Sequence, residues 1–392
     1  MIANAQRMFN FDLGETADAI RDTVAGFSQN EIAPRAAEID RSNQFPRDLW
    51  PKIGELGLHG ITVEEEYGGA GLGYLEHCIA MEEISRASAS VGLSYGAHSN
   101  LCVNQIRRNG NEAQKRKYLP KLISGEHVGS LAMSEPQAGS DVVSMKTRAD
   151  KRGDRFVLNG SKMWITNATQ ADWCCLLANT SEGPVHSNKS LIVVPMDAKG
   201  ITTQKIKKIG MNASDTAQVF FDNVRVPRRN LIGTEGTGFM MQMIQFQEER
   251  LCAASGALKS LDRLIDLTIE YCKERHTFGQ PLINNQVIHF RLAELRTEVE
   301  LLRSLTYRAV EQYVQGKDVT RLASMAKLKT GRLFREVSDA CLQYWGGMGF
   351  TYDNPISQSY RDSRLISIGG GADEIMLGII CKFEGTLPKK QR

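Results

Sequence analysis

Three consecutive glycines stand ahead of a helix-like segment in the stretch SIGGGADEIMLG, residues 367–378. Glycines let the backbone come close to a ligand, and the free N–H groups at the start of a helix attract negative charge. The stretch could therefore bind an anion. The other interpretation is a plain turn, because glycine is common ahead of a helix.

Two other segments carry the residue types that suit a planar cofactor. LAMSEPQAGSD (131–141) ends a predicted strand at Ser134 and continues into a loop of small residues. KMWITN (162–167) places Trp164 and Thr166 on one face of a strand, because alternate side chains point the same way. Together they would supply an aromatic wall, hydroxyl groups and backbone amides. The alternative for Trp164 is a core tryptophan, since most tryptophans are well buried.

A third pair of segments could hold a pyrophosphate. RHTFGQ (275–280) has a basic residue beside a turn, and QYWGGMGF (343–350) has a Gly-Gly turn after a helix. Backbone N–H groups in such turns form anion-binding concavities. Neither segment identifies a ligand by itself.

The segment QFQEERLCAASGA (245–257) carries two adjacent glutamates. On a helix, Glu248 and Glu249 point about 100° apart, so only one of them can face a given pocket. Small residues follow at Cys252, Ala253 and Ser255 and leave room beside that pocket. The plain alternative is a solvated glutamate on a helix surface.

The composition narrows the class of protein. The chain has 392 residues, enough for two or three domains, and its net charge of +3 is too small to indicate nucleic-acid binding. We interpret the basic tail LPKKQR as a solvated end, and we find no apolar run long enough to span a membrane. The first residues, MIANAQRMFNF, resemble neither a secretory signal nor a transit segment.

The cysteines and histidines indicate compartment rather than chemistry. The eight cysteines lack C-x-x-C spacing, so we expect buried thiols in a reducing compartment. The seven histidines have no metal-ligand spacing, and we expect no metal. We expect a cytosolic protein, bacterial cytoplasm being favoured, or a mitochondrial matrix protein seen without its presequence.

Hydrophobic periodicity divides the chain into three parts. Residues 1–128 have a helical pattern, interrupted by the glycine-rich loop EEEYGGAGLGY. Residues 129–238 contain short runs rich in β-branched and aromatic residues, separated by turns, which predict a small β domain. Residues 239–392 return to a helical period, with long helices near 239–273, 283–315 and 320–345 that predict a bundle, and a last helix after the three glycines.

Seven segments, in this order and spacing, resemble the acyl-CoA dehydrogenase family of flavoproteins over nearly the whole chain. These segments are EEYGGAGLGY, LAMSEPQAGSDVVSMKT, NGSKMWITNA, FDNVRVPRRNLIG, ERHTFGQ, QYWGGMGF and RDSRLISI. The resemblance implies an α+β fold with an N-terminal helical domain, a middle β-barrel or sandwich domain and a C-terminal four-helix bundle. It also implies a homotetramer. Within the family, the first half is most similar to enzymes acting on isovaleryl-CoA.

The resemblance further implies FAD between the β domain and the C-terminal bundle. On this basis the flavin would be held by Met133, Ser134, Trp164, Thr166, Ala372 and Glu374. Gln286 would also bind the cofactor. A neighbouring subunit would hold the adenosine and pyrophosphate with Arg275, Phe278, Gln343 and Gly347. Ala372 stands where relatives have threonine, so one hydroxyl contact is lost.

The family reaction is α,β-desaturation of an acyl thioester, which requires a carboxylate base. In many members the base is a glutamate at the position of Gly370. Glycine cannot abstract a proton but keeps its backbone N–H, which would polarise the thioester carbonyl. The family pattern Glu-Arg-Leu then selects Glu249 as the base.

The substrate follows from four matched positions. By resemblance, Leu93 and Ala97 line the end of the acyl chain, Ser140 lies near the thioester, and Arg250 lies close to the CoA arm. Gln247 departs from an aspartate that binds the pantetheine in relatives. These matches favour isovaleryl-CoA as substrate and an electron-transfer flavoprotein as acceptor.

Three alternatives stand beside this interpretation. The same chemistry could act on a longer branched chain such as citronellyl-CoA, since the second half also resembles bacterial members proposed to use such groups. Oxygen could replace the flavoprotein acceptor in an oxidase. The remote alternative is a non-catalytic protein on the same fold, because a fold alone does not prove function.

Overall fold

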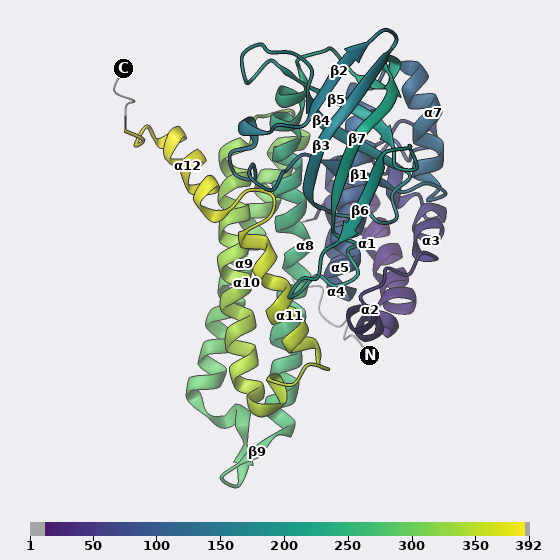
Figure 1. Ribbon diagram of the computed structural model, residues 1–392. Coiled ribbons are helices and arrows are strands. Elements are labelled where there is room, and N and C mark those ends of the chain that lie inside the picture. The colour runs from purple at the N-terminus through teal and green to yellow at the C-terminus, as the bar shows by residue number, and fades with distance from the viewer. Residues whose placement is uncertain (1–11, 389–392) are drawn as a thin grey trace.

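The structure is a computed structural model that describes residues 12–388. The first eleven residues and the last four residues of the basic tail, both interpreted above from sequence, lie outside this range. Figure 1 has the predicted order of helices, then strands, then helices, with the sheet beside one end of a long helical bundle. The mixed architecture expected from the sequence is therefore confirmed.

The N-terminal part packs short helices around an aromatic core. Trp50 is buried against Phe45 with ring centroids 4.6 Å apart, and its indole N–H donates to Gln170 from the β part at 2.9 Å. This bond joins the two parts through the core. The helices of this part are α1 (Glu15–Phe27), α2 (Ala36–Ser42), α3 (Leu49–Glu55), α4 (Tyr74–Ala87), α5 (Ala89–Gly96), α6 (Asn104–Asn109) and α7 (Glu112–Ile123).

The middle part is an eight-stranded sheet in the order β6-β7-β3-β2-β4-β5-β8, with β1 paired in parallel to β4. Its central strands β4 and β5 are buried nearly throughout, which explains their continuous apolar runs. The strands are β1 (Gly129–Ala132), β2 (Arg148–Arg152), β3 (Arg155–Ile165), β4 (Trp173–Asn179), β5 (Lys189–Pro195), β6 (Ile201–Lys205), β7 (Ala217–Pro227) and β8 (Leu231–Ile232).

The C-terminal part is built on three long helices with a hairpin at the far end of the bundle (Figure 1). Leucine, valine and cysteine side chains at helical spacing form its core. Its elements are α8 (Gly238–Glu274), β9 (His276–Thr277), β10 (Gln280–Pro281), α9 (Gln286–Val314), α10 (Thr320–Gly349), α11 (Pro355–Ser363) and α12 (Asp373–Glu384).

Two local features bear on the sequence-based expectation. The backbone of α10 is non-helical at Gly346, with φ 57° and ψ −138°, so two helical segments meet at a kink where the Gly-Gly turn was predicted. The cysteines are free thiols, but Cys381 is only half-buried, so the expectation of burial is wrong for that residue. Within residues 12–388, no helix is both long and apolar enough to cross a membrane.

Candidate functional site

The two adjacent glutamates of α8 have different surroundings. Glu248 is buried and fully engaged: its carboxylate accepts from Tyr313 Oη at 2.5 Å and Asn104 Nδ2 at 3.0 Å, and it pairs with Arg108 at 2.8 Å. The side chain of Glu249 makes no hydrogen bond or ion pair with any residue in the 12–388 range. Glu248 is thus a structural residue, and Glu249 is the carboxylate left available.

Glu249 faces the glycine loop. A Cβ built on Gly370 would lie 3.2 Å from Oε1 of Glu249, so the carboxylate occupies the space that a side chain at position 370 would need. Burial raises the pKa of Glu249, while the nearby charges of Arg250 and Lys327 oppose this rise. A desolvated carboxylate with a raised pKa is suited to accepting a proton.

The loop itself depends on glycine and on a buried lysine. Gly370 has φ 63° and Gly371 has φ 96°, a region that L side chains rarely adopt. The Nζ of Lys327, on α10, donates to the carbonyl oxygen of Gly371. Burial lowers the pKa of Lys327 to about 8, although Asp373 and Glu249 raise it. Lys327 therefore fastens the loop to the bundle beside Glu249.

Arg250 lies next to Glu249 and is also buried. Its guanidinium is 5.5 Å from the ring centre of Phe246 and donates weakly to Ser324 at 3.4 Å, while its Nε has no partner among the described residues. Desolvation lowers the pKa of this arginine and Glu249 raises it. An arginine with an unused buried donor is able to bind a polar ligand group.

The two sheet segments predicted to hold a flat cofactor are in contact. Met163 N donates to Ser134 O at 2.9 Å, and Lys162 Nζ donates to Met133 O at 2.8 Å and pairs with Glu135 at 3.0 Å. The buried ion pair between Lys162 and Glu135 thus holds the end of β3 against the segment that follows β1.

Trp164 is not a core residue. Its side chain is 58% exposed, and its φ of 65° lies in the left-handed region, at an irregularity of β3. The core alternative for this tryptophan is therefore wrong. Thr166 follows just past the strand and is half-buried. An exposed ring on a strained strand end is available to a ligand.

Hydrogen bonds and close packing join this strand end to α5 and α8. Asn167 Nδ2 donates to the carbonyl oxygen of Ser94 in α5 at 2.9 Å. A Cβ on Gly96 would lie 3.5 Å from Sγ of Cys252, one helical turn from Glu249. The predicted chain-end residues Leu93 and Ala97 flank these contacts, Ala97 buried and Leu93 half-buried.

Five predicted cofactor residues lie away from this cluster, at the hairpin end of the bundle. Phe278 is fully exposed at the tip between β9 and β10 (Figure 1). The other four residues are also exposed. Arg275 and Gln286 lie on either side of the hairpin in the sequence, and Gln343 and Gly347 lie near the end of α10. The single chain does not bring these residues to the Glu249 cluster.

The remaining predicted residues are spread along the loops. Ala372 caps α12 and Glu374 is exposed in its first turn, next to the glycine loop. Ser140 is exposed in the loop after β1. The side-chain oxygen Oε1 of Gln247 already accepts a hydrogen bond from Val319 N at 2.9 Å, so this atom is not available to a ligand.

Sequence reasoning missed Lys327 and the network around Glu248. The local sequence ASMAKLKTG gives no sign that this lysine is buried, because its partner Gly371 is far along the chain. The partners of Glu248 likewise come from α6 and α9, so only the fold reveals them.

Comparisons with known proteins match all three parts of the chain to one family. The N-terminal, middle and C-terminal domains of acyl-CoA dehydrogenases match residues 14–126, 130–224 and 236–384. The mitochondrial isovaleryl-CoA dehydrogenase of Oryza sativa subsp. japonica is 44% identical, over 93% of this chain and 90% of the relative. The mitochondrial 2-methylacyl-CoA dehydrogenase of Solanum tuberosum is 42% identical, over 95% and 92%.

A solved structure has the same overall fold. The acyl-CoA dehydrogenase from Geobacillus kaustophilus superimposes with a TM-score of 0.92 at 35% identity, covering 95% of this chain and 98% of that one.

Proposed function

The chain belongs to the acyl-CoA dehydrogenase family and is an FAD-dependent acyl-CoA dehydrogenase, and we propose that it oxidises a short branched acyl-CoA, isovaleryl-CoA to 3-methylcrotonyl-CoA. The observation that carries the proposal is the position of Glu249. Its carboxylate is desolvated, unpaired within residues 12–388 and directed at Gly370, where a Cβ would lie only 3.2 Å from Oε1.

In this proposal Glu249 takes the α-proton of the thioester. The backbone N–H of Gly370 donates to the thioester carbonyl, where negative charge develops as the proton leaves. Desolvation raises the pKa of this carboxylate and so brings it nearer to neutrality. Lys327 keeps the glycine loop at a fixed distance from the base. FAD, when bound, supplies the acceptor for the β-hydride.

The residues at the strand end fit a flavin. Trp164 offers an exposed aromatic face, and Ser134 and Thr166 offer hydroxyl groups next to it. Met133 and Ser134 are held in place by Lys162 and Met163, so that side of the site is rigid before any cofactor binds. Ala372 and Glu374, at the start of α12, would meet the flavin from the loop side.

The exposed hairpin end supports a tetramer in which each subunit completes a neighbour's cofactor site. Phe278 and Phe350 are exposed by 103% and 88% of their reference areas, so both rings are accessible to a neighbouring chain. Arg275, Gln286, Gln343 and Gly347 would then hold the adenosine and pyrophosphate of the adjacent subunit. Reduced flavin would pass its electrons to an electron-transfer flavoprotein.

The branched substrate is favoured by the space around the base. The base on α8 faces glycine on the opposite wall, and small residues line α8 beyond it at Cys252, Ala253 and Ser255. Leu93 and Ala97 would limit the far end of a short chain, and Ser140 and Arg250 would lie toward the thioester and CoA arm. The relative named for 2-methylacyl-CoA makes a different branching position the first alternative, and a longer branched chain the second.

The test is an anaerobic titration of the flavin-loaded protein with isovaleryl-CoA, in which flavin absorbance is recorded. The same titration is carried out on the Glu249→Gln and Glu248→Gln variants. We expect bleaching at about one equivalent in the wild type and in Glu248→Gln, and binding without bleaching in Glu249→Gln. Bleaching of Glu249→Gln would overturn the base assignment.

Two other results would redirect the proposal. Bleaching only with longer or 2-methyl-branched thioesters would overturn the substrate. Absence of flavin from the purified protein would favour the non-catalytic alternative, and hydrogen peroxide release in air would favour an oxidase.

A further inference from the structure

The glycine-rich loop EEEYGGAGLGY, residues 64–74, takes no part in the reaction as proposed above. Its glycines nevertheless allow a close fit. A Cβ on Gly69 would lie 2.0 Å from the carbonyl oxygen of Val63, so only glycine fits at this position. The N–H of Gly71 donates to the same carbonyl oxygen at 2.8 Å. The loop is therefore fixed against the segment before it, and it ends at Tyr74, the first residue of α4.

The side chain of Tyr74 reaches the helix that carries the candidate base. Its hydroxyl donates to the backbone carbonyl oxygen of Glu248, on α8, at 2.6 Å, and the side-chain oxygen of Asn100 lies farther away, at 3.0 Å. The ring is buried and stacks on His77 with centroids 5.4 Å apart. The carbonyl group of Glu248 belongs to the peptide that joins this residue to Glu249, so the hydrogen bond acts directly next to the base.

The carbonyl oxygen of Glu248 can accept two hydrogen bonds. Inside α8 it faces the N–H of Cys252, four residues farther on, and that bond uses one lone pair. The hydroxyl of Tyr74 uses the other. Two donors that approach from different directions fix the plane of this peptide more firmly than the helix does alone.

Glu249 needs this support because its own side chain has no anchor. In the part of the chain that the structure describes, no residue forms a hydrogen bond or an ion pair with its carboxylate. The direction of the side chain therefore follows from the backbone of α8. Position matters here, since a displacement of about 1 Å can cost roughly a hundredfold in rate.

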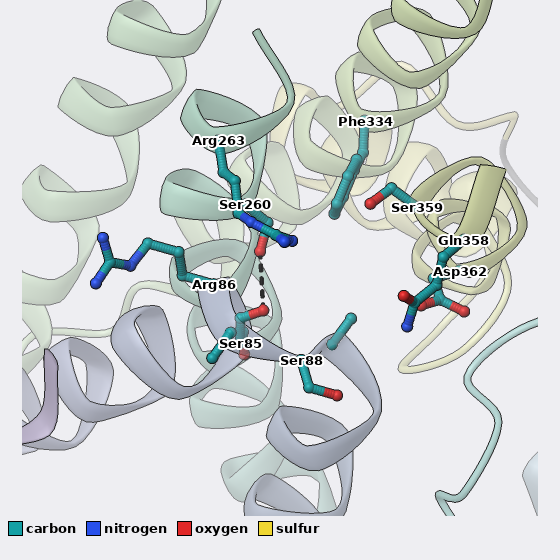
Figure 2. Close-up of a pocket in the computed structure, with 11 residues that line it drawn as sticks. Ser85, Arg86, Ser88, Ser260, Arg263, Phe334, Gln358, Ser359 and Asp362 are labelled. Atoms are coloured by element: carbon teal, nitrogen blue, oxygen red, sulfur yellow. Dashed lines mark hydrogen bonds between the residues drawn. The ribbon is translucent and has the colours of Figure 1, made fainter. Parts of the chain in front are cut away.

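A second hydrogen bond joins the same two helices farther along. Ser260 Oγ donates to the carbonyl oxygen of Ser85 at 3.2 Å, beside a small cavity (Figure 2). Close by, a Cβ on Gly256 would lie 3.0 Å from Oγ of Ser85, so the helices are tightly packed there. The two bonds lie nearly the same number of residues apart on each helix, so α4 and α8 run in the same direction in a fixed register. Tyr74 holds the part of α8 that carries the base.

The side-chain network of Glu248 keeps Tyr74 in place. The rings of Tyr74 and Tyr313 meet edge to face with centroids 5.2 Å apart, and Tyr313 donates to the carboxylate of Glu248. Glutamine at position 248 would keep an acceptor for Tyr313 and the backbone carbonyl for Tyr74. Glu248→Gln should therefore leave this arrangement largely intact.

We propose that Tyr74 is a positioning residue for the base: its hydroxyl holds the peptide between Glu248 and Glu249 and thereby keeps the carboxylate of Glu249 opposite Gly370. This inference rests on the proposed function, because it takes Glu249 as the base. It also gives the glycine-rich loop a role, which is to place Tyr74 against α8.

The experiment compares Tyr74→Phe with a matched control from the same loop. Tyr74→Phe removes only the hydroxyl and keeps the ring that stacks on His77. The control is Tyr67→Phe. The ring of Tyr67 is also buried, and its hydroxyl donates at 2.7 Å to Glu112, which lies on α7 and not on α8. Both variants thus lose one tyrosine hydrogen bond of similar length.

The measurement isolates the proton step in the flavin-loaded protein. The probe is (methylthio)acetyl-CoA deuterated at its α-carbon, which has sulfur in place of the β-carbon and cannot lose a β-hydride. The base takes an α-deuteron, exchanges it with water and returns a proton to the carbon, so NMR records the loss of deuterium. At saturating probe we expect Tyr74→Phe to slow this exchange about tenfold, with little change in the Kd of the probe, and Tyr67→Phe to match wild type.

The outcomes separate this inference from the proposed function. Exchange in Tyr74→Phe as fast as in Tyr67→Phe would overturn the positioning role, and so would equal slowing in both variants. Melting curves show whether the two substitutions cost the same stability, which a purely structural tyrosine would lose without a change in exchange. Glu249→Gln is measured alongside: exchange as fast as in wild type would overturn the base itself, and the positioning role with it. Loss of exchange in Glu249→Gln with normal exchange in Tyr74→Phe would overturn the positioning role alone.

Discussion

Oε1 of Glu249 lies 3.2 Å from the point where a Cβ on Gly370 would be. The two positions that the family resemblance offers for the base therefore face each other, and a side chain at 370 would make a tight contact with the carboxylate at 249. This contact and the φ of 63° both favour glycine at position 370.

Gly370→Ala should reduce both activity and stability. The new methyl group would meet the carboxylate of Glu249 and force an alanine into a left-handed backbone conformation, which costs about 1 kcal/mol or more. We expect a lower Tm and a loss of kcat of about tenfold to a hundredfold, because a small displacement of the base is expensive. Melting curves and steady-state kinetics measure the two effects.

Gly378→Ala is the matched control for that variant. Gly378 lies in the interior of α12, and a Cβ there would meet nothing within 4 Å. Alanine should be neutral or stabilising by up to about 1 kcal/mol, since glycine is a poor helix former. Equal losses in both variants would contradict the importance of the Glu249–Gly370 contact.

The two adjacent glutamates should separate stability from catalysis. Glu248→Gln leaves Arg108 without its counter-ion, and because this arginine is partly exposed we expect a loss of about 2 kcal/mol rather than the full cost of a broken buried pair. Its kcat should change little.

Glu249→Gln should have the opposite profile. Removing an unpaired, partly desolvated charge should leave the Tm unchanged or raise it, and removing a general base should lower kcat by about 10²–10⁴-fold. Parallel melting and kinetic measurements on the two variants decide this, and a catalytic loss in Glu248→Gln as large as that in Glu249→Gln would contradict the assignment.

Lys327→Met should change the pH profile as well as the rate. The positive charge of Lys327 lowers the pKa of Glu249, so its removal should move the acidic limb of the kcat profile to higher pH. The loop would also lose the bond from Nζ to Gly371, which should reduce kcat. Lys327→Arg keeps the charge and should keep the position of the limb. A lower rate with an unmoved limb in Lys327→Met would mean that the lysine acts only on the loop.

Much of this site could be predicted from the sequence, and the failures have physical causes. The strong apolar runs of β4 and β5 were predictable because both faces of these strands are buried, and the long periodic helices were predictable because one face of each is buried. The charged segment RADKR of β2 and the short polar helix α11 carry no such pattern. Trp164 could not be assigned to the surface, because its exposure follows from a strand irregularity. Lys327 carries no local signal of burial, since distant elements bury it.

Buried neutral histidines should make the protein sensitive to mild acid. Burial lowers the pKa of both His77 and His98 to about 4, from an ordinary value of 6.5. Between these values the unfolded chain binds protons that the folded protein does not, so stability is complete above pH 6.5 and falls as the pH drops toward 4. Each histidine could contribute a loss of up to about 3 kcal/mol.

Melting temperatures between pH 7 and pH 4.5 test this. Burial raises the pKa of Glu135, but the Lys162 charge and hydrogen bonds lower it to about 2. The stability that this carboxylate contributes is therefore lost only below its ordinary pKa of 4.5, outside the pH range of the measurement. His77→Leu should flatten the slope. Burial raises the pKa of Asp362 to about 7, so this carboxyl group opposes the histidine effect over the same pH range. Equal slopes in wild type and His77→Leu would therefore contradict the prediction.

Subunit complementation should reveal whether the hairpin end completes a neighbour's site. If Arg275 binds the cofactor of the adjacent subunit, Arg275→Ala inactivates the active site of that adjacent subunit. Glu249→Gln inactivates the active site of its own subunit. In a mixed assembly, a subunit carrying Arg275→Ala keeps its own Glu249 and receives an intact Arg275 from a Glu249→Gln neighbour. Co-expression of the two inactive variants should therefore restore part of the wild-type activity, measured on tandem-tagged mixed assemblies. Two variants that act within one subunit cannot restore each other, so a mixed assembly with no activity would place Arg275 in the site of its own chain.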